Sequence, residues 1–116
     1  MYYIGIDISK FKHDCAVIDD SGEIVTPSWS FTNDAEGFSQ LKLLLNSLDT
    51  ETRIGLESTG HYGMNLKLFL ESNNFSFMEF NPLLINRFVK SKSLRKTKSD
   101  SIDCMMIAHY LMTVEY

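Results

Sequence analysis

Residues 1–31 read MYYIGIDISKFKHDCAVIDDSGEIVTPSWSF, and this stretch decides the architecture that the rest of the chain completes. Apolar and β-forming residues run or alternate over residues 2–8, 13–19 and 23–31. The links between them are short and polar, and Asp20-Ser21-Gly22 is a turn signal. The pattern predicts a three-stranded antiparallel meander.

The meander is followed by a predicted helix and a strand-helix-strand unit. Asn33 and Glu36 form a capping-box pattern, and apolar residues then recur at helical spacing at Phe38, Leu41, Leu45 and Leu48. Residues 53–57 and 75–80 are typical of strands on either side of a helix over 61–73, and such strands are parallel by default.

Two more helices complete the predicted architecture. Asn81-Pro82 is typical of an N-cap with proline at the first helical position, and this short helix is expected to run to about Val89. A last helix is expected to begin near Asp100. The whole is predicted to be an α/β fold, with a five-stranded mixed sheet and helices on its faces.

Composition favours one folded domain over residues 1–116. Hydrophobic residues make up 44% of the chain and charged residues 22%, without repeats or biased segments. The N-terminus lacks the pattern of a signal peptide, and no apolar stretch approaches the roughly 18 residues needed to span a bilayer. We therefore expect a cytoplasmic protein without a membrane partner. In that compartment Cys15 and Cys104, which form no Cys-x-x-Cys pair, are expected to be small buried residues.

The net charge is −4, but the positive charges are unevenly distributed. Six of the eleven basic residues lie in one stretch without acidic residues, the basic stretch: Arg87, Lys90, Lys92, Arg95, Lys96 and Lys98. A cluster of this kind is either a solvated loop or a surface that contacts phosphates. Because candidate catalytic carboxylates lie beside it in sequence, we expect it to bind the nucleic-acid backbone.

Two strand ends carry the same triplet of glycine, aliphatic residue and carboxylate, Gly5-Ile6-Asp7 and Gly55-Leu56-Glu57. The first and third residues of a strand triplet share a face. If the two strands are parallel neighbours, both carboxylates lie at the carboxyl end of the sheet, where ligands generally bind. The glycines are then expected to leave room for something to approach. The alternative is that each acid only marks a strand end that faces water.

Asp100 and Asp103 are one turn apart on the predicted last helix. By helical rotation they share a face with apolar residues, so we expect them to point toward the core. The alternative is helix capping, with Asp100 as the N-cap and Asp103 as an acid in the first turn. Several carboxylates brought together repel one another, and oxygen-only ligands favour Mg²⁺ or Mn²⁺ as the counter-charge. Two such ions would suit phosphodiester chemistry.

Four segments carry a resemblance to a known family. They are Gly5-Ile6-Asp7-Ile8-Ser9-Lys10, Glu57-Ser58-Thr59-Gly60-His61-Tyr62, Asn81-Pro82 and Lys96-Thr97-Lys98-Ser99-Asp100-Ser101-Ile102-Asp103. In this order they resemble the DEDD transposases of insertion-sequence family 110, which include pilin-gene-inverting and bridge-RNA-guided recombinases. The chain differs from the family in having Lys98-Ser99-Asp100 where Lys-Thr-Asp is usual, and Cys104 where alanine is usual.

The resemblance implies a ribonuclease-H-like, RuvC-like fold in which Asp7, Glu57, Asp100 and Asp103 form a catalytic tetrad that ligates divalent metal. It implies that DNA is a partner and that the protein forms a homo-oligomer. A guide RNA is a second partner that the resemblance suggests. Family members continue into a second domain that carries a serine nucleophile. The chain is therefore expected to be a fragment, the metal-binding catalytic domain of a DNA transposase or recombinase without its serine-bearing domain.

Three other functions are open from the residues. A Holliday-junction-type nuclease would share the acids and use metal-activated water. A non-catalytic nucleic-acid-binding or assembly module would keep only the fold. An actin-like or sugar-kinase-like ATPase fragment also opens on Gly5-Ile6-Asp7, but the turn Ile8-Ser9-Lys10-Phe11-Lys12 lacks the glycines of a phosphate loop.

The back of the last helix carries Ile102, Met105, Met106 and Met112. Such a helix is apolar nearly all round and is normally covered on both sides. We expect this face to pack against another copy of the domain or against a following region. The alternative is that the helix from Pro82 to Val89 folds over it.

Overall fold

The computed structural model describes residues 1–57, 60–92 and 103–114. Its elements, in chain order, are β1 (Tyr2–Ile8), β2 (Lys12–Asp19), β3 (Ile24–Thr32), α1 (Ala35–Ser47), β4 (Thr52–Glu57), the 3₁₀ helix η1 (Gly60–Gly63), α2 (Met64–Ser72), β5 (Met78–Phe80), α3 (Pro82–Ser91) and α4 (Cys104–Leu111). The predicted elements are therefore all present, although several begin or end at other residues.

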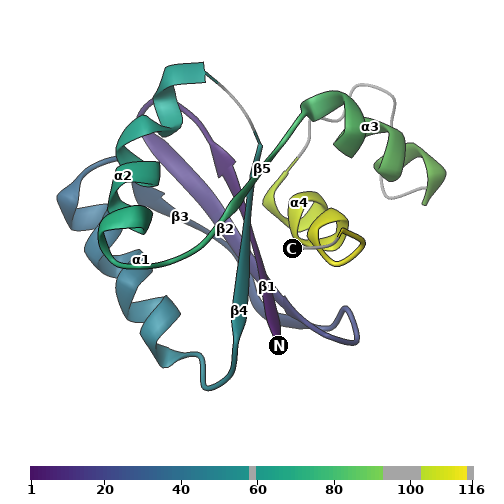
Figure 1. Cartoon of the computed structure of the whole chain (residues 1–116), viewed down its shortest axis with the longest axis horizontal. Helices are drawn as coiled ribbons and strands as arrows, with labels where there is room; N and C mark the ends of the chain where they lie inside the picture. Colours follow the sequence, from purple (N-terminus) through teal and green to yellow (C-terminus); the bar gives the residue numbers. More distant parts are fainter. Residues whose placement is uncertain (58–59, 93–102, 115–116) are drawn as a thin grey trace.

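The five strands form one mixed sheet in the order β3-β2-β1-β4-β5. β1 pairs antiparallel with β2 and β2 with β3, which confirms the meander. β1 pairs parallel with β4, and β4 with β5, so the strand-helix-strand unit is parallel as predicted. Helices α1 and α2 lie on one face of the sheet, and α4 with α3 lies on the other (Figure 1). This is the predicted α/β, RuvC-like (ribonuclease-H-like) architecture.

Alternating side chains of β1 enter two different cores. Ile4, Ile6 and Ile8 pack with residues of α1 and α2, among them Leu41, Leu45, Leu66 and Leu70. On the opposite face a smaller core joins β5, α3 and α4 through Phe80, Ile85, Val89, Met106, Ile107 and Leu111. Because side chains alternate along a strand, Gly5 and Asp7 belong to the α4 face.

Gly5 and Gly55 lie where α4 packs closely on the sheet. A Cβ atom on Gly5 would lie 2.1 Å from the carbonyl oxygen of Cys104 and 2.5 Å from the amide nitrogen of Ala108, both backbone atoms of α4. A Cβ on Gly55 would lie 2.8 Å from the Phe80 ring and within 3.5 Å of Leu111 and Ile107. The glycines do leave room for something to approach, and what approaches is helix α4.

Two predicted helix starts are wrong. Asp34, not Asn33, is the N-cap of α1, because its Oδ1 accepts the Gly37 amide at 2.9 Å. The last helix begins at Cys104 rather than near Asp100, with Asp103 as its N-cap. Asn81 does cap α3, accepting the Leu83 amide at 2.8 Å with Pro82 at the first position.

Helix α3 packs on the outer face of α4. A partner was expected there from the sequence, and cover by this helix was the alternative. Met106, expected on an open face, is 8% exposed and packs with Ile85 and Val89 of α3. Met105 and Met112 are only partly buried, and Ile102 lies outside the described residues, so a partner at that part of the face stays a prediction. Cys15 and Cys104 are both free and buried, as predicted. In the described part of the chain no helix is long and apolar enough to cross a membrane.

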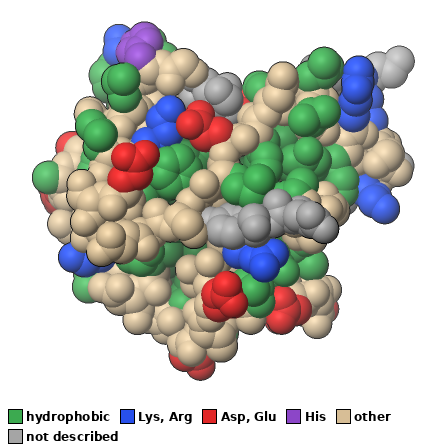
Figure 2. Space-filling model, in the orientation of Figure 1, with side chains coloured by type: hydrophobic (Ala, Val, Ile, Leu, Met, Phe, Trp, Pro, Cys, Tyr) green, Lys and Arg blue, Asp and Glu red, His purple; other side chains and the backbone are tan. Residues whose placement is uncertain are grey.

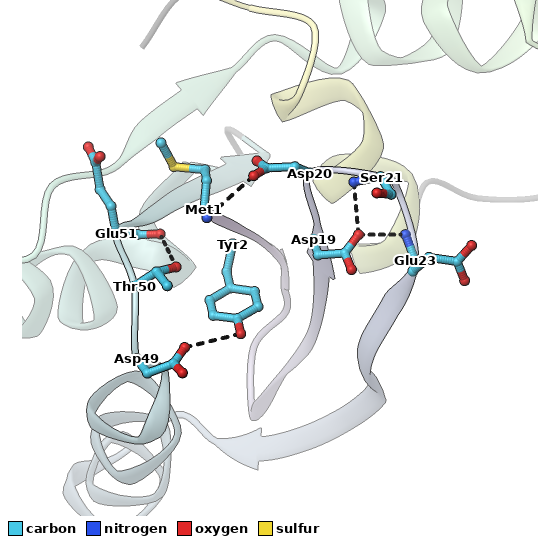
Figure 3. A network of polar contacts seen from close by, with 9 residues as sticks. All are labelled: Met1, Tyr2, Asp19, Asp20, Ser21, Glu23, Asp49, Thr50 and Glu51. Carbon is cyan, nitrogen blue, oxygen red and sulfur yellow. Dashed lines mark hydrogen bonds and ion pairs between the residues drawn. The ribbon is translucent and has the colours of Figure 1, made fainter.

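The amino edge of the sheet is held by local polar contacts (Figure 3). Asp19 Oδ1 accepts the amides of Ser21 at 2.9 Å and Glu23 at 3.0 Å, which closes the β2–β3 turn. The Tyr2 hydroxyl donates to Asp49 at 3.2 Å and so ties β1 to the segment after α1. Two of the carboxylates at this edge, Asp19 and Asp49, thus accept hydrogen bonds from groups beside them.

Candidate metal and nucleic-acid site

Asp7 and Glu57 lie at the carboxyl edge of the sheet. The parallel register pairs Gly5 with Gly55 and Ile6 with Leu56, and continuing it by one residue puts Asp7 beside Glu57. Both side chains are half-buried. The repeated triplet therefore places the two carboxylates on neighbouring strands, at equivalent positions and on the same face.

Asp14 adds a carboxylate that the sequence analysis did not single out. The antiparallel register pairs Asp14 of β2 directly with Asp7 of β1, so their side chains share the α4 face. The Ser30 hydroxyl of β3 donates a hydrogen bond to Asp14. The signal was present in the sequence, because a tight β1–β2 hairpin about residues 9–11 places Asp14 opposite Asp7.

Asp103 reaches this edge from α4. Its Oδ1 accepts the Met106 amide at 2.9 Å, which makes it the N-cap of the helix. The side chain is exposed, so the prediction that it points toward the core is wrong. The close packing of α4 on Gly5 nevertheless brings this helix end toward Asp7, two residues farther along β1. Asp100, the fourth predicted acid, lies outside the described residues.

Burial and the carboxylates of Glu57, Asp14 and Asp103, in that order, raise the pKa of Asp7 to about 6. Desolvation disfavours the charged form, and each like charge adds to the effect. Asp34 shows the opposite case, because hydrogen bonds from Thr32 and Gly37 lower the pKa of its carboxyl group. Asp7 thus lies in surroundings that would favour a bound cation.

The thiol of Cys104 lies beside the carboxylates but is not a reactive group. Burial, followed by the charges of Asp103, Asp14 and Asp7, raises the pKa of Cys104 despite a hydrogen bond with Ser28. Its Sγ is 3.3 Å from the Ser28 hydroxyl. A thiol with a raised pKa is a poor nucleophile and a poor metal ligand, so the donors available here are carboxylate oxygens.

Oxygen donors without histidine or cysteine are the ligands that Mg²⁺ and Mn²⁺ prefer, so the chemistry of Asp7, Glu57 and Asp103 fits such an ion. Among the described residues, no group of three or more His, Cys, Asp or Glu side chains is arranged to hold a metal ion. The described carboxylates therefore match the ion in donor type, and Asp100 stays a predicted ligand.

The basic stretch begins on α3. Arg87, Lys90 and Lys92 are exposed on the last turns of that helix and at its C-cap. Lys and Arg side chains gather over this end of the molecule (Figure 2). Arg95, Lys96 and Lys98 lie outside the described residues. The described half of the stretch is thus open to solvent and available to a partner.

A family model described as a transposase, that of the DEDD transposases of the IS110 type, matches residues 4–115. The chain belongs to this family. The match covers the meander, the strand pair with its carboxylates, and α4. It confirms the resemblance drawn from the four sequence segments.

Named relatives of this IS110-family chain are longer proteins. A pilin gene-inverting protein of Moraxella bovis is 34% identical over 112 residues, and one of Moraxella lacunata is 33% identical over 111. Each match covers 93% of this chain and 33% of the relative. A candidate mini-circle transposase for IS117 from Streptomyces coelicolor is 28% identical over 115 residues, 96% of this chain and 27% of that protein. The chain thus spans about a third of the length of the relatives it matches.

Proposed function

We propose that this chain is the metal-binding catalytic domain of a DNA transposase or recombinase and acts on DNA phosphodiesters. The observation that carries the proposal is the convergence of Asp7, Glu57 and Asp103 from β1, β4 and α4 at the carboxyl edge of the sheet. The family match and the names of the relatives support a transposase.

The carboxylates would hold Mg²⁺ or Mn²⁺, with Asp100 as the fourth ligand. When bound, the cation would supply Lewis acidity that offsets the negative charge developing on the phosphate oxygens. The chain's own part is to bring carboxylates from separate elements to one edge, through the parallel register of β1 with β4 and the close packing of α4 on Gly5. Asp14 adds negative charge from the neighbouring strand.

DNA is the proposed partner, and the basic stretch is the proposed contact with its backbone. A guide RNA and a homo-oligomer stay predictions from the family resemblance. The relatives are about three times as long as the matched region, so strand exchange by a whole protein, with a serine nucleophile supplied from outside this chain, is likewise a proposal.

The metal site can be tested through the melting temperature. Mn²⁺ should raise that of the wild type, because a ligand bound only by the folded state stabilises it. Each kcal/mol of stabilisation corresponds to about 4 °C for a domain of 116 residues. Asp7→Asn and Asp103→Asn should abolish the rise. Asparagine caps helices about as well as aspartate, so Asp103→Asn removes the charge and keeps the N-cap of α4.

Asp34→Asn is the matched control, because Asp34 is also an aspartate N-cap but belongs to α1. It should keep the full rise. Asp103→Ala should lose about 1 kcal/mol of stability even in EDTA, as expected when a helix loses its cap. Equal Mn²⁺-induced rises in wild type, Asp7→Asn and Asp103→Asn would reject the metal site.

A further inference from the structure

Two neighbouring loops at the carboxyl edge carry exposed rings and cations. They form what we call the aromatic-basic lip: Lys10, Phe11, Lys12, His61 and Tyr62. Phe11, in the β1–β2 turn, is 76% exposed, and Tyr62, in η1, is 38% exposed. The Lys10 ammonium lies 5.0 Å from the centre of the Phe11 ring. The His61 and Tyr62 rings have centroids 4.4 Å apart.

Asn33 holds the two loops together. Its Nδ2 donates to the carbonyl of Lys10 at 3.1 Å and to that of Tyr62 at 3.2 Å. Its backbone amide donates to the carbonyl of Phe11 at 2.9 Å. One side chain thus bridges the loop that follows the strand of Asp7 and the loop that follows the strand of Glu57, which explains why Asn33 does not cap α1.

Further contacts steady the base of the lip. A Cβ on Gly63 would lie 2.7 Å from Cδ1 of Ile8, so η1 packs closely on the last residue of β1. The buried His13 ring accepts the amide of Ser9 at 3.2 Å through Nδ1. Lys10, Phe11 and Tyr62 are therefore held to Asn33 through their backbone carbonyls, and Gly63 packs on β1.

The charges of the lip indicate what it binds. Of the eleven basic residues, six belong to the basic stretch, and two of the other five are Lys10 and Lys12. Both are exposed. On the face seen in Figure 2, a histidine, a Lys or Arg and hydrophobic side chains are all exposed at the end of the molecule where α2 begins in Figure 1. Cations placed among exposed rings match the phosphates and bases of one nucleic-acid strand.

We propose that the aromatic-basic lip binds an unpaired DNA strand, with its bases stacked on Phe11 and Tyr62 and its phosphates beside Lys10 and Lys12. Bases of a duplex are already stacked on their neighbours, so such rings favour a single strand. The proposal rests on the proposed function only in placing this strand next to the carboxylates that act on DNA. The lip would then be a second DNA contact of the chain, in addition to the basic stretch.

The test is fluorescence anisotropy in EDTA with a short labelled DNA single strand of mixed sequence and with its duplex. Phe11→Ala and Tyr62→Ala should each weaken single-strand binding about fivefold or more, because stacking on one ring is worth roughly 1–3 kcal/mol. Phe11→Trp, which keeps a stacking ring, should bind like the wild type. Leu43→Ala is the control for removing an exposed apolar side chain, because Leu43 is 72% exposed on α1.

The lysines have their own readout. Lys10→Ala and Lys12→Ala together should flatten the dependence of log Kd on log salt by about 1.4, or about 0.7 for each phosphate contact with a single strand. Lys42→Ala, an exposed lysine of α1, should leave it unchanged. Circular dichroism would establish that each variant is folded.

Three outcomes would contradict the proposed role of the lip: a loss of duplex affinity in the ring variants as large as their loss of single-strand affinity, wild-type single-strand affinity in both ring variants, or an equal loss of affinity in Leu43→Ala. Because binding is measured without metal, these outcomes are separate from the Mn²⁺-induced rise in melting temperature. Either proposal can therefore fail while the other holds.

Discussion

Asp7 is a residue whose charge opposes folding. Its pKa in the folded protein is about 6, above the value of 3.8 for an unperturbed aspartate, so between these pH values the folded state binds more protons than the unfolded chain. Stability from this group is fully present below about pH 4 and is lost as pH rises through about 6.

Asp7→Asn should therefore be more stable than the wild type at pH 7 in EDTA, by about 1–2 kcal/mol. A full two-unit shift corresponds to roughly 3 kcal/mol, and partial exposure to solvent reduces it. The difference should disappear near pH 4, where Asp7 is protonated in the wild type. Urea denaturation at the two pH values measures it.

Asp14→Asn separates the charge effect from simple removal of Asp7. Because the Asp14 carboxylate contributes to the raised pKa of Asp7, neutralising it should also stabilise the protein at pH 7, but by less. A wild type more stable than Asp7→Asn at pH 7 in EDTA would mean that the carboxylates do not repel one another as the geometry implies.

The positions of Asp7 and Glu57 could be predicted because one triplet occurs twice, and a glycine two residues before a strand carboxylate marks their shared face. Asp14 was not predicted because its place depends on the hairpin register, which a pattern of apolar residues alone leaves open by a residue or two. Asp103 was assigned to the right edge but the wrong local geometry, since Asp100 and Asp103 both suit a helix N-terminus.

At the scale of elements, helix starts were the least predictable feature. Asn33 and Asp34 are adjacent residues that both cap helices well, so the sequence favours neither. The structure separates them by tertiary contacts, because Asn33 is engaged with Lys10 and Tyr62 while Asp34 accepts the amide of Gly37. A cap assigned from one segment cannot take such distant partners into account.

The packing of α3 on α4 decides how the smaller core is closed. Ile85 of α3 is fully buried there, so Ile85→Ala should destabilise the protein by about 2–4 kcal/mol through reduced burial and the cavity left behind. Leu83 and Leu84, on the same helix, are 56% and 46% exposed. Leu83→Ala and Leu84→Ala should change the free energy of unfolding by less than about 0.5 kcal/mol.

Urea denaturation of these three variants tests whether α3 covers α4 in solution. If Ile85→Ala were as mild as the two surface changes, α3 would not be part of the core and the back of α4 would need another cover. That result would also restore the self-association expected from the methionines of the last helix.

At the scale of the whole molecule, the mixed sheet could be predicted from the order of patterns along the chain. The close packing of α4 on the sheet could not. Gly5 and Gly55 were expected to leave room for something to approach, and the backbone of α4 approaches Gly5 while side chains of β5 and α4 approach Gly55. This packing matters for function, because a helix lying on Gly5 presents its N-terminal Asp103 to the carboxyl edge.

The net charge of −4 would repel DNA from the molecule as a whole, so binding must depend on local positive charge. Arg87, Lys90 and Lys92 are exposed at the end of α3, where cations gather in Figure 2.

Replacing Arg87, Lys90 and Lys92 with alanine should weaken duplex binding similarly for every DNA sequence. It should also reduce the slope of log Kd against log salt by about 0.9 for each phosphate that the variant no longer neutralises. Lys42→Ala, which removes one exposed charge from α1, should keep the wild-type slope. Anisotropy titrations with a labelled duplex across a range of salt concentrations measure both quantities. A slope that stays the same in the triple variant would make this part of the basic stretch an ordinary solvated surface. The aromatic-basic lip would then be the remaining proposed DNA contact among the described residues.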